Sequence, residues 1–283
     1  MSAKAARRTG ANPLLAYVEL LHLPPVAMVL LGTAGCMVIA AGGWPPLDRL
    51  ALVLSAVLLT QLAISVHNDY CDRLLDAQTK PWRALPRGLL TPRAALAWTA
   101  TLTALGLLAA APLGPEVVAL VAFGPAAGFV YNAALKRTAW SWLPFWVALP
   151  TIPLVAFAAE GRAAPQLGLI YLIAGPLVIS VHLADTLSDI DSDQAWDVRG
   201  FAHRLGARGA RWVCWAAMAS AQALAWLLWP SGTGPNAGLA LSCLALLSAV
   251  AFDRWRIRGG HWLAIMASAV TLAVGWLSGA GSR

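Results

Sequence analysis

The sequence predicts an all-α, polytopic membrane protein in which nine transmembrane helices surround a central cavity. Its 283 residues are 59% hydrophobic and only 12% charged, whereas a water-soluble domain carries about 25% charged residues. The mean hydropathy is +0.66, and apolar runs near the length needed to cross a bilayer recur along the whole chain. The low charge excludes intrinsic disorder. Four scattered cysteines without a CxxC pair exclude a disulfide-rich secreted fold.

Nine apolar runs, separated by charged residues or by proline and glycine clusters, are the expected spans. They use most of the chain, so residues 13–283 are expected to form one transmembrane domain. Residues 1–12 are expected to be a disordered basic tail that acts as an uncleaved topology signal, because no small-residue cleavage site follows a short apolar core. Prolines at positions 144, 150 and 153 are expected to bend the fifth span. The expected spans are residues 24–41, 49–67, 94–113, 117–135, 140–159, 167–184, 211–229, 237–253 and 261–280.

Basic residues alternate along the chain and predict its orientation. The tail and the loops after spans two, four, six and eight hold 17 of the 20 lysines and arginines. By the positive-inside rule, these segments and the N-terminus face the cytoplasm, and the C-terminus lies on the opposite side. The formal net charge of +7 is therefore expected at the membrane edges, where the partner is the lipid bilayer and not nucleic acid.

Acidic residues gather in two short segments. Eight of the 13 acids lie within residues 68–76 and 185–197, each at the cytoplasmic end of a span. A spacing of four places the members of each set on one helix face, where like charges repel one another. Mg²⁺ relieves such repulsion, because it takes one or two protein carboxylates and leaves its other positions to water and phosphate oxygens. The two sets are Asn68, Asp72 and Asp76, and Asp185, Asp189, Asp193 and Asp197.

The two acidic sets are related by a constant offset of 117 residues, which maps positions 68, 72 and 76 onto 185, 189 and 193. This offset predicts two four-helix repeats, about residues 13–135 and 140–253, with a ninth helix at about 261–280. Four spans in each repeat preserve the orientation, so the repeats are expected to be parallel. Both acidic sets would then face a shared central cavity from the cytoplasmic side.

With these motifs in order, the chain resembles the UbiA superfamily of intramembrane prenyltransferases. The first family motif, NDxxDxxxD, is complete at residues 68–76, and the second, DxxxDxxxD, is complete at residues 185–193. A (K/R)PxRPxxxG-like segment occupies residues 80–88, with Ala84 in place of the second proline, and a YxxxLKR-like segment occupies residues 131–137. The resemblance extends from the first span to about Gly206.

The resemblance implies a bundle whose cavity holds a polyprenyl diphosphate, with its tail in the apolar part and its diphosphate bound through Mg²⁺ at both motifs. The allylic C–O bond ionises, and the cation alkylates an acceptor. Asp69, Asp72, Asp185 and Asp189 are the implied catalytic residues. The implied metal ligands are Asn68, Asp72, Asp76, Asp185, Asp189 and Asp193, with Asp69, Asp76 and Asp193 as outer ligands or supports. Lys80, Arg83, Tyr131, Lys136 and Arg137 are the implied contacts to the diphosphate and in the capping loops.

Three functions remain open at this point. Transfer of a prenyl group to a small, aromatic acceptor is favoured. A terpene cyclase would use the same diphosphate site. A divalent-cation transporter is the remote alternative, because it predicts acids deep within spans, whereas these lie at span ends beside a basic loop. Residues 21–25 lack the arginine of the RLDKP segment found in quinone-pathway members, which disfavours a carboxylated aromatic acceptor. His67 and His182 are expected to be packing residues.

Overall fold

The computed structural model describes residues 13–163, 165–187, 200–229, 237–255, 257 and 259–281. Every regular element in this part of the chain is helical, which confirms the predicted all-α class. The helices are α2 (Pro13–Leu20), α3 (Leu23–Ala41), α4 (Leu47–Thr79), α5 (Pro92–Ala110), α6 (Pro115–Val130), α7 (Leu143–Ala148), α8 (Thr151–Ala159), α9 (Ile170–Leu187), α11 (Phe201–Leu227), α12 (Ala237–Arg254) and α13 (Gly260–Gly281).

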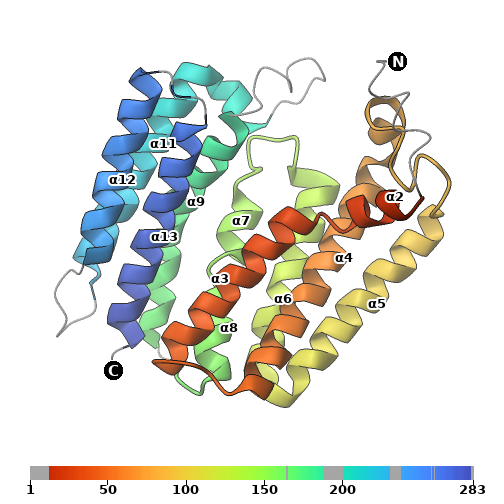
Figure 1. Ribbon diagram of the computed structural model, residues 1–283, viewed down its shortest axis with the longest axis horizontal. Helices are drawn as coiled ribbons and strands as arrows, with labels where there is room; N and C mark the ends of the chain where they lie inside the picture. The colour runs from red at the N-terminus through yellow and green to blue at the C-terminus, as the bar shows by residue number, and fades with distance from the viewer. Residues whose placement is uncertain are drawn as a thin grey trace.

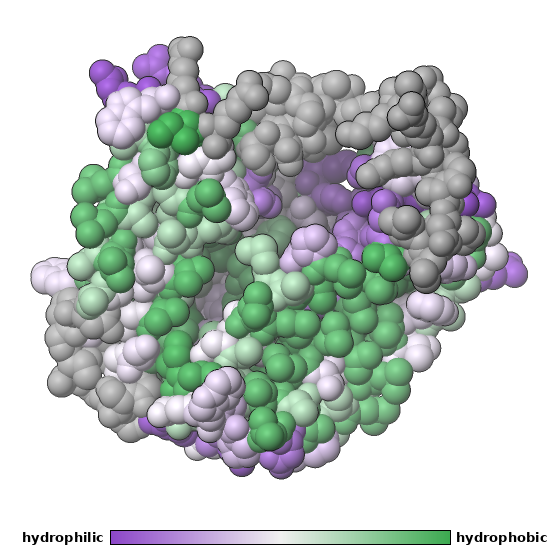
Figure 2. Space-filling model, in the orientation of Figure 1, coloured by the Kyte–Doolittle hydropathy of each residue, from purple (hydrophilic) through white to green (hydrophobic). Residues whose placement is uncertain are grey.

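Seven helices within the described ranges are long and apolar enough to cross a membrane: α3, α4, α5, α6 with the turn that follows it, α9, α12 and α13. The protein is therefore an integral membrane protein with several apolar helices. On the visible face, hydrophobic side chains dominate the middle, and hydrophilic ones gather in the upper part around a hollow (Figure 2).

Two expected spans differ from a simple helix. The segment expected at 140–159 is interrupted, because α7 ends at Ala148 and α8 begins at Thr151, with Pro150 between them. The bend expected from the prolines is thus a break. The segment expected at 211–229 begins earlier, at Phe201, and contains Gly206 in a non-helical conformation with φ 67° and ψ 161°. This glycine separates a first short turn from the long body of α11.

The helices form two groups (Figure 1), and the space-filling view in the same orientation shows a hollow in the upper part of this face (Figure 2). Helices α3 to α8 make one group, and α9 and α11 to α13 make the other. Contacts between α3 and α13 and between α7 and α9 join the groups.

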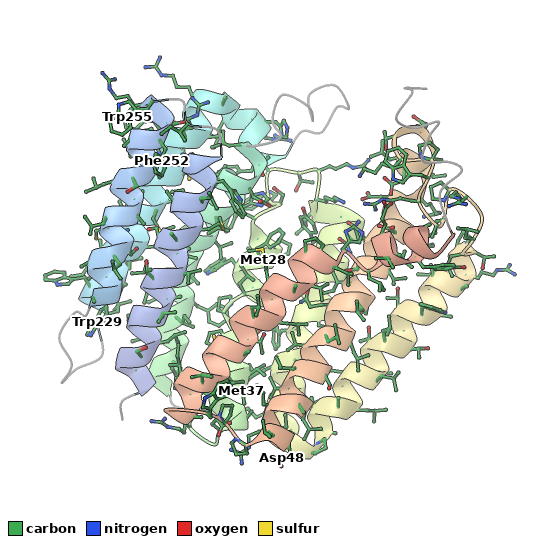
Figure 3. All side chains as sticks on the ribbon, viewed as in Figure 1. Met28, Met37, Asp48, Trp229, Phe252 and Trp255 are labelled. Atoms are coloured by element: carbon green, nitrogen blue, oxygen red, sulfur yellow. The ribbon has the colours of Figure 1, made fainter. Side chains whose placement is uncertain are left out.

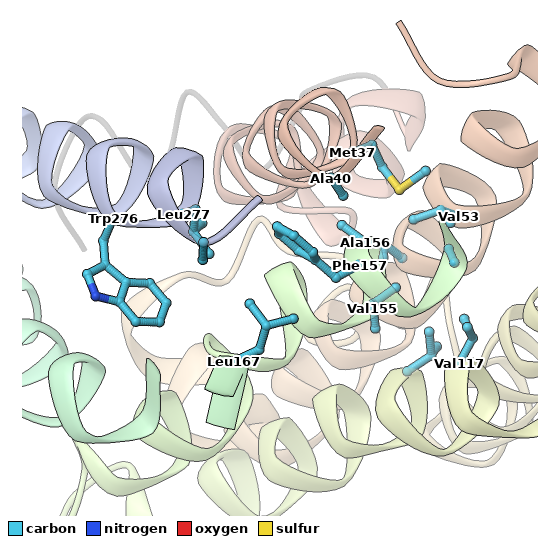
Figure 4. Close-up of a cluster of buried hydrophobic side chains, with 14 of the residues drawn as sticks. Met37, Ala40, Val53, Val117, Val155, Ala156, Phe157, Leu167, Trp276 and Leu277 are labelled. Atoms are coloured by element: carbon cyan, nitrogen blue, oxygen red, sulfur yellow. The ribbon is translucent and has the colours of Figure 1, made fainter. Parts of the chain in front are cut away.

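The largest buried apolar cluster lies at the lower end of the bundle, where both groups contribute side chains. Phe157 of α8 packs there with Met37 of α3 and Trp276 of α13 (Figure 4). Asp48 and Trp229 also mark this end, whereas Phe252 and Trp255 lie at the opposite end (Figure 3). The apolar cluster therefore closes the bundle at the end away from the hollow.

The ends of α4, α9 and α12 point to the same side of the molecule, and the C-terminus lies at the other (Figure 1). Each of these ends leads into a loop that the sequence marks as rich in lysine and arginine. The ends of these three helices thus lie on one side of the molecule, and the orientation of the basic loops in the membrane stays a prediction.

Candidate active site

Helix α4 carries the first acidic motif inside its last turns. The apolar run ends near residue 67, yet the helix continues to Thr79. Asp69, Asp72 and Asp76 are all buried there. A helix this rich in buried carboxylates requires cationic partners, because an unpaired buried charge is expensive.

The first group of partners comes from the segment after α6. Residues Tyr131–Leu135 form a π-helical turn, closed by the bond from the Lys136 amide to the Tyr131 carbonyl at 2.9 Å. Beyond this turn, the Lys136 Nζ donates to Asn68 Oδ1 at 2.7 Å and to Asp72 Oδ2 at 2.5 Å. Arg137 adds a bond from Nη2 to Asp72 Oδ1 at 3.3 Å. Two cations thus hold the central carboxylate of the motif.

The second group of partners comes from the loop after α4. The Arg83 guanidinium donates to Asp69 Oδ1 and, at 3.3 Å, to Asp76 Oδ2. His22 donates from Nε2 to Asp69 Oδ1 at 2.8 Å, and Lys80 Nζ lies 3.6 Å from Asp76 Oδ1. Arg83 is therefore a bridge between two motif carboxylates.

Local contacts hold this loop over the end of α4. Tyr17 of α2 donates its hydroxyl to the Leu89 carbonyl at 2.7 Å. Ala84 is fully buried, at the position where the family pattern has a proline. Gly88 has φ 71°, a conformation that suits glycine because it has no Cβ. The loop is consequently a fixed cap and not a free surface segment.

A cavity of about 480 Å³ lies beside these ion pairs. Asp72, Asp76 and Lys80 line one side, and Lys136 and Arg137 belong to the same wall. The opposite wall is built from α9 and the start of α11. The cavity is also lined by Leu75, Thr79, Trp82, Tyr131, Ser141, His182, Thr186, Gly200, Phe201 and His203.

His182 joins the two walls. Its Nε2 is hydrogen-bonded to Ser141 Oγ at 2.9 Å, and its ring stacks near Phe145, with centroids 5.5 Å apart. His67 instead packs on Phe129 at 4.7 Å and does not line this cavity. Of the two histidines expected to be packing residues, only His182 faces the site.

The second acidic motif is described only at its first residue. Asp185 accepts a bond from Trp262 Nε1 at 3.0 Å, and its neighbours His182 and Thr186 line the cavity. Asp189 and Asp193, like Asp191 and Asp197, lie outside the described residues. The helix that carries Asp185 therefore reaches the same cavity as the first motif, and the rest of the motif stays a prediction.

Two further pockets lie inside the bundle, and one of them adjoins the polar cavity. One of about 270 Å³ lies between α3, α4, α6 and α7 and shares Tyr131 with the polar cavity. The other pocket, of about 210 Å³, lies between α3, α8, α9 and α13 and shares Leu149 with the 270 Å³ pocket. Tyr131 packs edge-on against Phe145 at 5.0 Å, at the junction. An apolar ligand attached to a polar head could occupy such a sequence of spaces.

The residues of the first motif suit Mg²⁺ held together with phosphate. Within the described part of the chain, no three Asp, Glu, His or Cys side chains lie close enough to hold a metal by themselves. Mg²⁺ needs only one or two protein carboxylates when phosphate oxygens supply further ligands. Asn68 and Asp72 supply oxygen atoms of the kind that Mg²⁺ prefers as ligands. In addition, Asp69 Oδ2 and Asp76 Oδ1 are buried without a hydrogen-bond donor among the described residues.

The structure unites most of the residues singled out from the sequence. Lys80, Tyr131, Lys136 and Arg137 line the cavity, whereas Arg83 contacts Asp69 and Asp76 and is not among the lining residues. Sequence reasoning did not identify His22 and Ser141. His22 lies within residues 21–25, where the sequence showed only that an arginine is missing, and Ser141 belongs to no motif. Their partners are 47 and 41 residues away in the chain.

Comparisons with known proteins agree with this geometry. The model of the UbiA prenyltransferase family matches residues 28–269. The bacteriochlorophyll synthase 33 kDa chain of Cereibacter sphaeroides is 31% identical over 213 residues, covering 71% of this chain and 68% of the relative. A digeranylgeranylglyceryl phosphate synthase of Methanothrix thermoacetophila is 27% identical over 233 residues, which cover 80% of this chain and 85% of the relative.

Solved structures share the fold. A UbiA homologue from Archaeoglobus fulgidus, bound to DMAPP and Mg²⁺, superposes with a TM-score of 0.70 at 17% identity, covering 93% of this chain and 99% of the homologue. A structure described for digeranylgeranylglyceryl phosphate synthase gives a TM-score of 0.72 at 16% identity. The match covers 96% of this chain and 99% of the synthase chain. The matched family and the shared fold establish that this chain belongs to the UbiA prenyltransferase family and is an intramembrane prenyltransferase.

Proposed function

We propose that this enzyme uses Mg²⁺ to ionise a polyprenyl diphosphate and transfers the prenyl group to a small, aromatic acceptor. The observation that carries the proposal is the 480 Å³ cavity, in which motif carboxylates and three cations share one wall. A site lined by both carboxylates and cationic side chains suits a diphosphate bound to a metal ion better than a metal ion alone or an anion alone.

The residues divide into metal-holding and phosphate-holding groups. Asn68, Asp72, Asp76, Asp185, Asp189 and Asp193 would hold Mg²⁺, with Asp69 as support. When bound, Mg²⁺ would act as a Lewis acid that stabilises negative charge on the leaving diphosphate. The homologue structures that contain DMAPP or GPP together with Mg²⁺ support this choice of metal and substrate.

Lys80, Lys136 and Arg137 would bind the diphosphate oxygens directly, and arginine does so with two parallel bonds. Arg83 would act through Asp69 and Asp76, which it holds in place. The adjoining apolar pockets would exclude water from the reacting carbon. Tyr131 and Phe145 would present aromatic rings beside it.

In the reaction, the allylic C–O bond breaks, and its electron pair leaves with the diphosphate. A nucleophilic atom of the acceptor forms the new bond to the allylic carbon, and the acceptor loses one proton. Atoms and charge therefore balance without an oxidant or reductant.

We further propose that α7 with α8 and the body of α11 complete nine spans. The first repeat would comprise about residues 13–135 and the second about residues 140–253, with α13 as the ninth helix; α7 and α8 would then belong to the second repeat although they pack in the first group of helices. Residues 13–283 would then form one transmembrane domain, preceded by the basic tail at 1–12. The end that carries the acidic motifs and the basic loops would face the cytoplasm.

The test is an assay of purified protein in detergent with Mg²⁺ and geranyl, farnesyl or geranylgeranyl diphosphate, with and without a phenol. We expect prenylated phenol, and we expect Asp72→Asn and Asp189→Asn to abolish donor consumption. Asp48→Asn is the matched control, because this exposed acid lies at the far end of the bundle (Figure 3). Near-normal turnover in both motif variants would contradict the site. A cyclic hydrocarbon formed without acceptor would favour the cyclase alternative.

A further inference from the structure

The pocket between α3, α4, α6 and α7 differs from an ordinary hydrocarbon pocket in its polar lining. His22, Gln61, Ser65, Asn68 and Asn132 contribute polar side chains to walls that are otherwise mostly apolar. The neighbouring 210 Å³ pocket is lined almost wholly by aliphatic side chains. A prenyl tail has no groups for hydrogen bonding. Four of the five side chains, His22, Ser65, Asn68 and Asn132, are bonded within the protein, so the fifth, Gln61, is the one that indicates a ligand with such groups.

Gln61 is the most informative of these residues. It lies in the apolar part of α4, seven residues before Asn68, which is about 10 Å along the helix axis. The neighbouring Ser65 hydroxyl is bonded to the Gln61 backbone carbonyl, and Asn132 is bonded to the Ile64 carbonyl. The Gln61 side-chain amide has no hydrogen-bond partner among the described residues. A half-buried amide inside a membrane helix without a partner is costly, and a ligand that bonds to it removes that cost.

His22, the residue before the first residue of α3, lines the same pocket in an unusual backbone conformation. It is the one non-glycine residue with positive φ in the described chain, with φ 48° and ψ 47°. Its Nε2 is committed to Asp69, while its ring lines the pocket. Strained backbone of this kind concentrates at ligand sites, because it fixes a side chain that regular structure would place elsewhere.

The pocket also has no lysine, arginine, aspartate or glutamate among its described lining residues. A carboxylate buried here would meet no cation of its own, since Arg83 is bound to Asp69 and Asp76. An uncharged head with hydroxyl, carbonyl or amide groups would meet Gln61 and His22 instead. Because Tyr131 and Asn68 stand between this pocket and the cations around Asp72, a ligand bound here would lie next to the reacting carbon.

We propose that this pocket is the acceptor site and that it selects an acceptor with an uncharged polar head, recognised by the Gln61 amide with His22. The inference rests on the proposed prenyl transfer and specifies its acceptor class.

The experiment compares 4-hydroxybenzamide with 4-hydroxybenzoate, two phenols of similar size that differ in charge. Their binding to the full-length protein in detergent is measured by tryptophan fluorescence, and transfer is measured in the same samples with the best prenyl diphosphate. We expect the amide to bind at least tenfold more tightly than the carboxylate. Gln61→Leu should weaken amide binding about five- to tenfold, as expected for one lost hydrogen bond, and should raise the acceptor KM while the KM for the prenyl diphosphate stays unchanged.

Two further variants make the result specific. Ser65→Ala is the matched control on the same wall, because its hydroxyl is already bonded to the helix backbone, and its binding should stay within twofold of the native protein. Gln61→Arg introduces a cation and should reverse the preference toward 4-hydroxybenzoate.

Equal binding of the two phenols, binding of neither, or an unchanged affinity in Gln61→Leu would overturn the acceptor assignment. These outcomes are separate from failure of the proposed function, which would appear as absence of Mg²⁺-dependent donor consumption by the native protein. If donor is consumed and closes into a hydrocarbon that no phenol diverts, both proposals fail.

Discussion

Arg83 offers the sharpest test of how the site is held together. Its guanidinium is only 16% exposed, and it bridges Asp69 and Asp76, whose side chains are each 2% exposed. Replacing Arg83 by Met removes one charge and leaves two buried carboxylates with weaker partners. Asp69 keeps His22 at 2.8 Å, whereas Asp76 keeps Lys80 at 3.6 Å, and the Lys80 side chain is 47% exposed.

Removing one partner of a buried ion pair costs about 3–5 kcal/mol. The remaining contacts of Asp69 and Asp76 place Arg83→Met near the lower limit, about 3 kcal/mol. With about 2–4 °C for each kcal/mol in chains of 150–250 residues, the melting temperature should fall by roughly 6–12 °C. Arg83→Lys should be intermediate, because an ammonium cannot reach both carboxylates with a planar fork.

The assay is thermal unfolding of purified protein in one detergent at one scan rate, since unfolding of such proteins is often irreversible. Arg93→Met is the matched control, because Arg93 is an exposed arginine in the first turn of α5, ten residues further along the chain. Adding Asp76→Asn to Arg83→Met should recover part of the loss by removing one unpaired charge. A melting temperature for Arg83→Met within about 2 °C of the Arg93→Met control would refute the claim that this bridge supports the motif.

Other variants test packing and the substrate contacts. Gly106→Ala should destabilise the protein by about 1–3 kcal/mol, because its Cβ would lie 2.7 Å from Thr60 Cγ2 and 3.1 Å from the Ala56 carbonyl. Gly35→Ala, which meets nothing within 4 Å, is the control in thermal unfolding. Lys136→Gln should raise the KM for the prenyl diphosphate at least tenfold, because a charge-assisted bond contributes about 1.5–3 kcal/mol; an unchanged KM would exclude a phosphate contact. Chelation with EDTA should abolish donor consumption and added Mg²⁺ should restore it, and activity that persists in EDTA would argue against the metal.

The sequence predicts what depends on local periodicity and composition. The apolar runs locate most of the helices within several residues, although α4 continues beyond its run to Thr79 and α11 begins before its run at Phe201. The spacing of Asn68, Asp72 and Asp76 places them on one helix face because the α-helix repeats every 3.6 residues. The family motifs locate Lys80, Tyr131, Lys136 and Arg137 at the same end of the bundle, where they line one cavity.

The remaining features depend on contacts between distant segments. Helix α4 continues beyond its apolar run because Lys136, Arg137 and Arg83 neutralise its carboxylates, and no local signal names those partners. The αL conformation of His22 is equally invisible in the sequence. Gln61 reads as one polar residue within an apolar span, and only the pocket formed by three other helices gives it a role.

The π-helical turn at Tyr131–Leu135 has a consequence for how homologous chains can vary. The turn is one residue wider than a regular helical turn. Deleting a single alanine there would restore α-helical geometry and rotate everything downstream by about 100°, which would carry Lys136 away from Asp72. Substitution at Ala133 or Ala134 leaves that phase unchanged. Natural relatives that keep the acidic motif should therefore vary at the positions of Ala133 and Ala134 but keep the length of this turn.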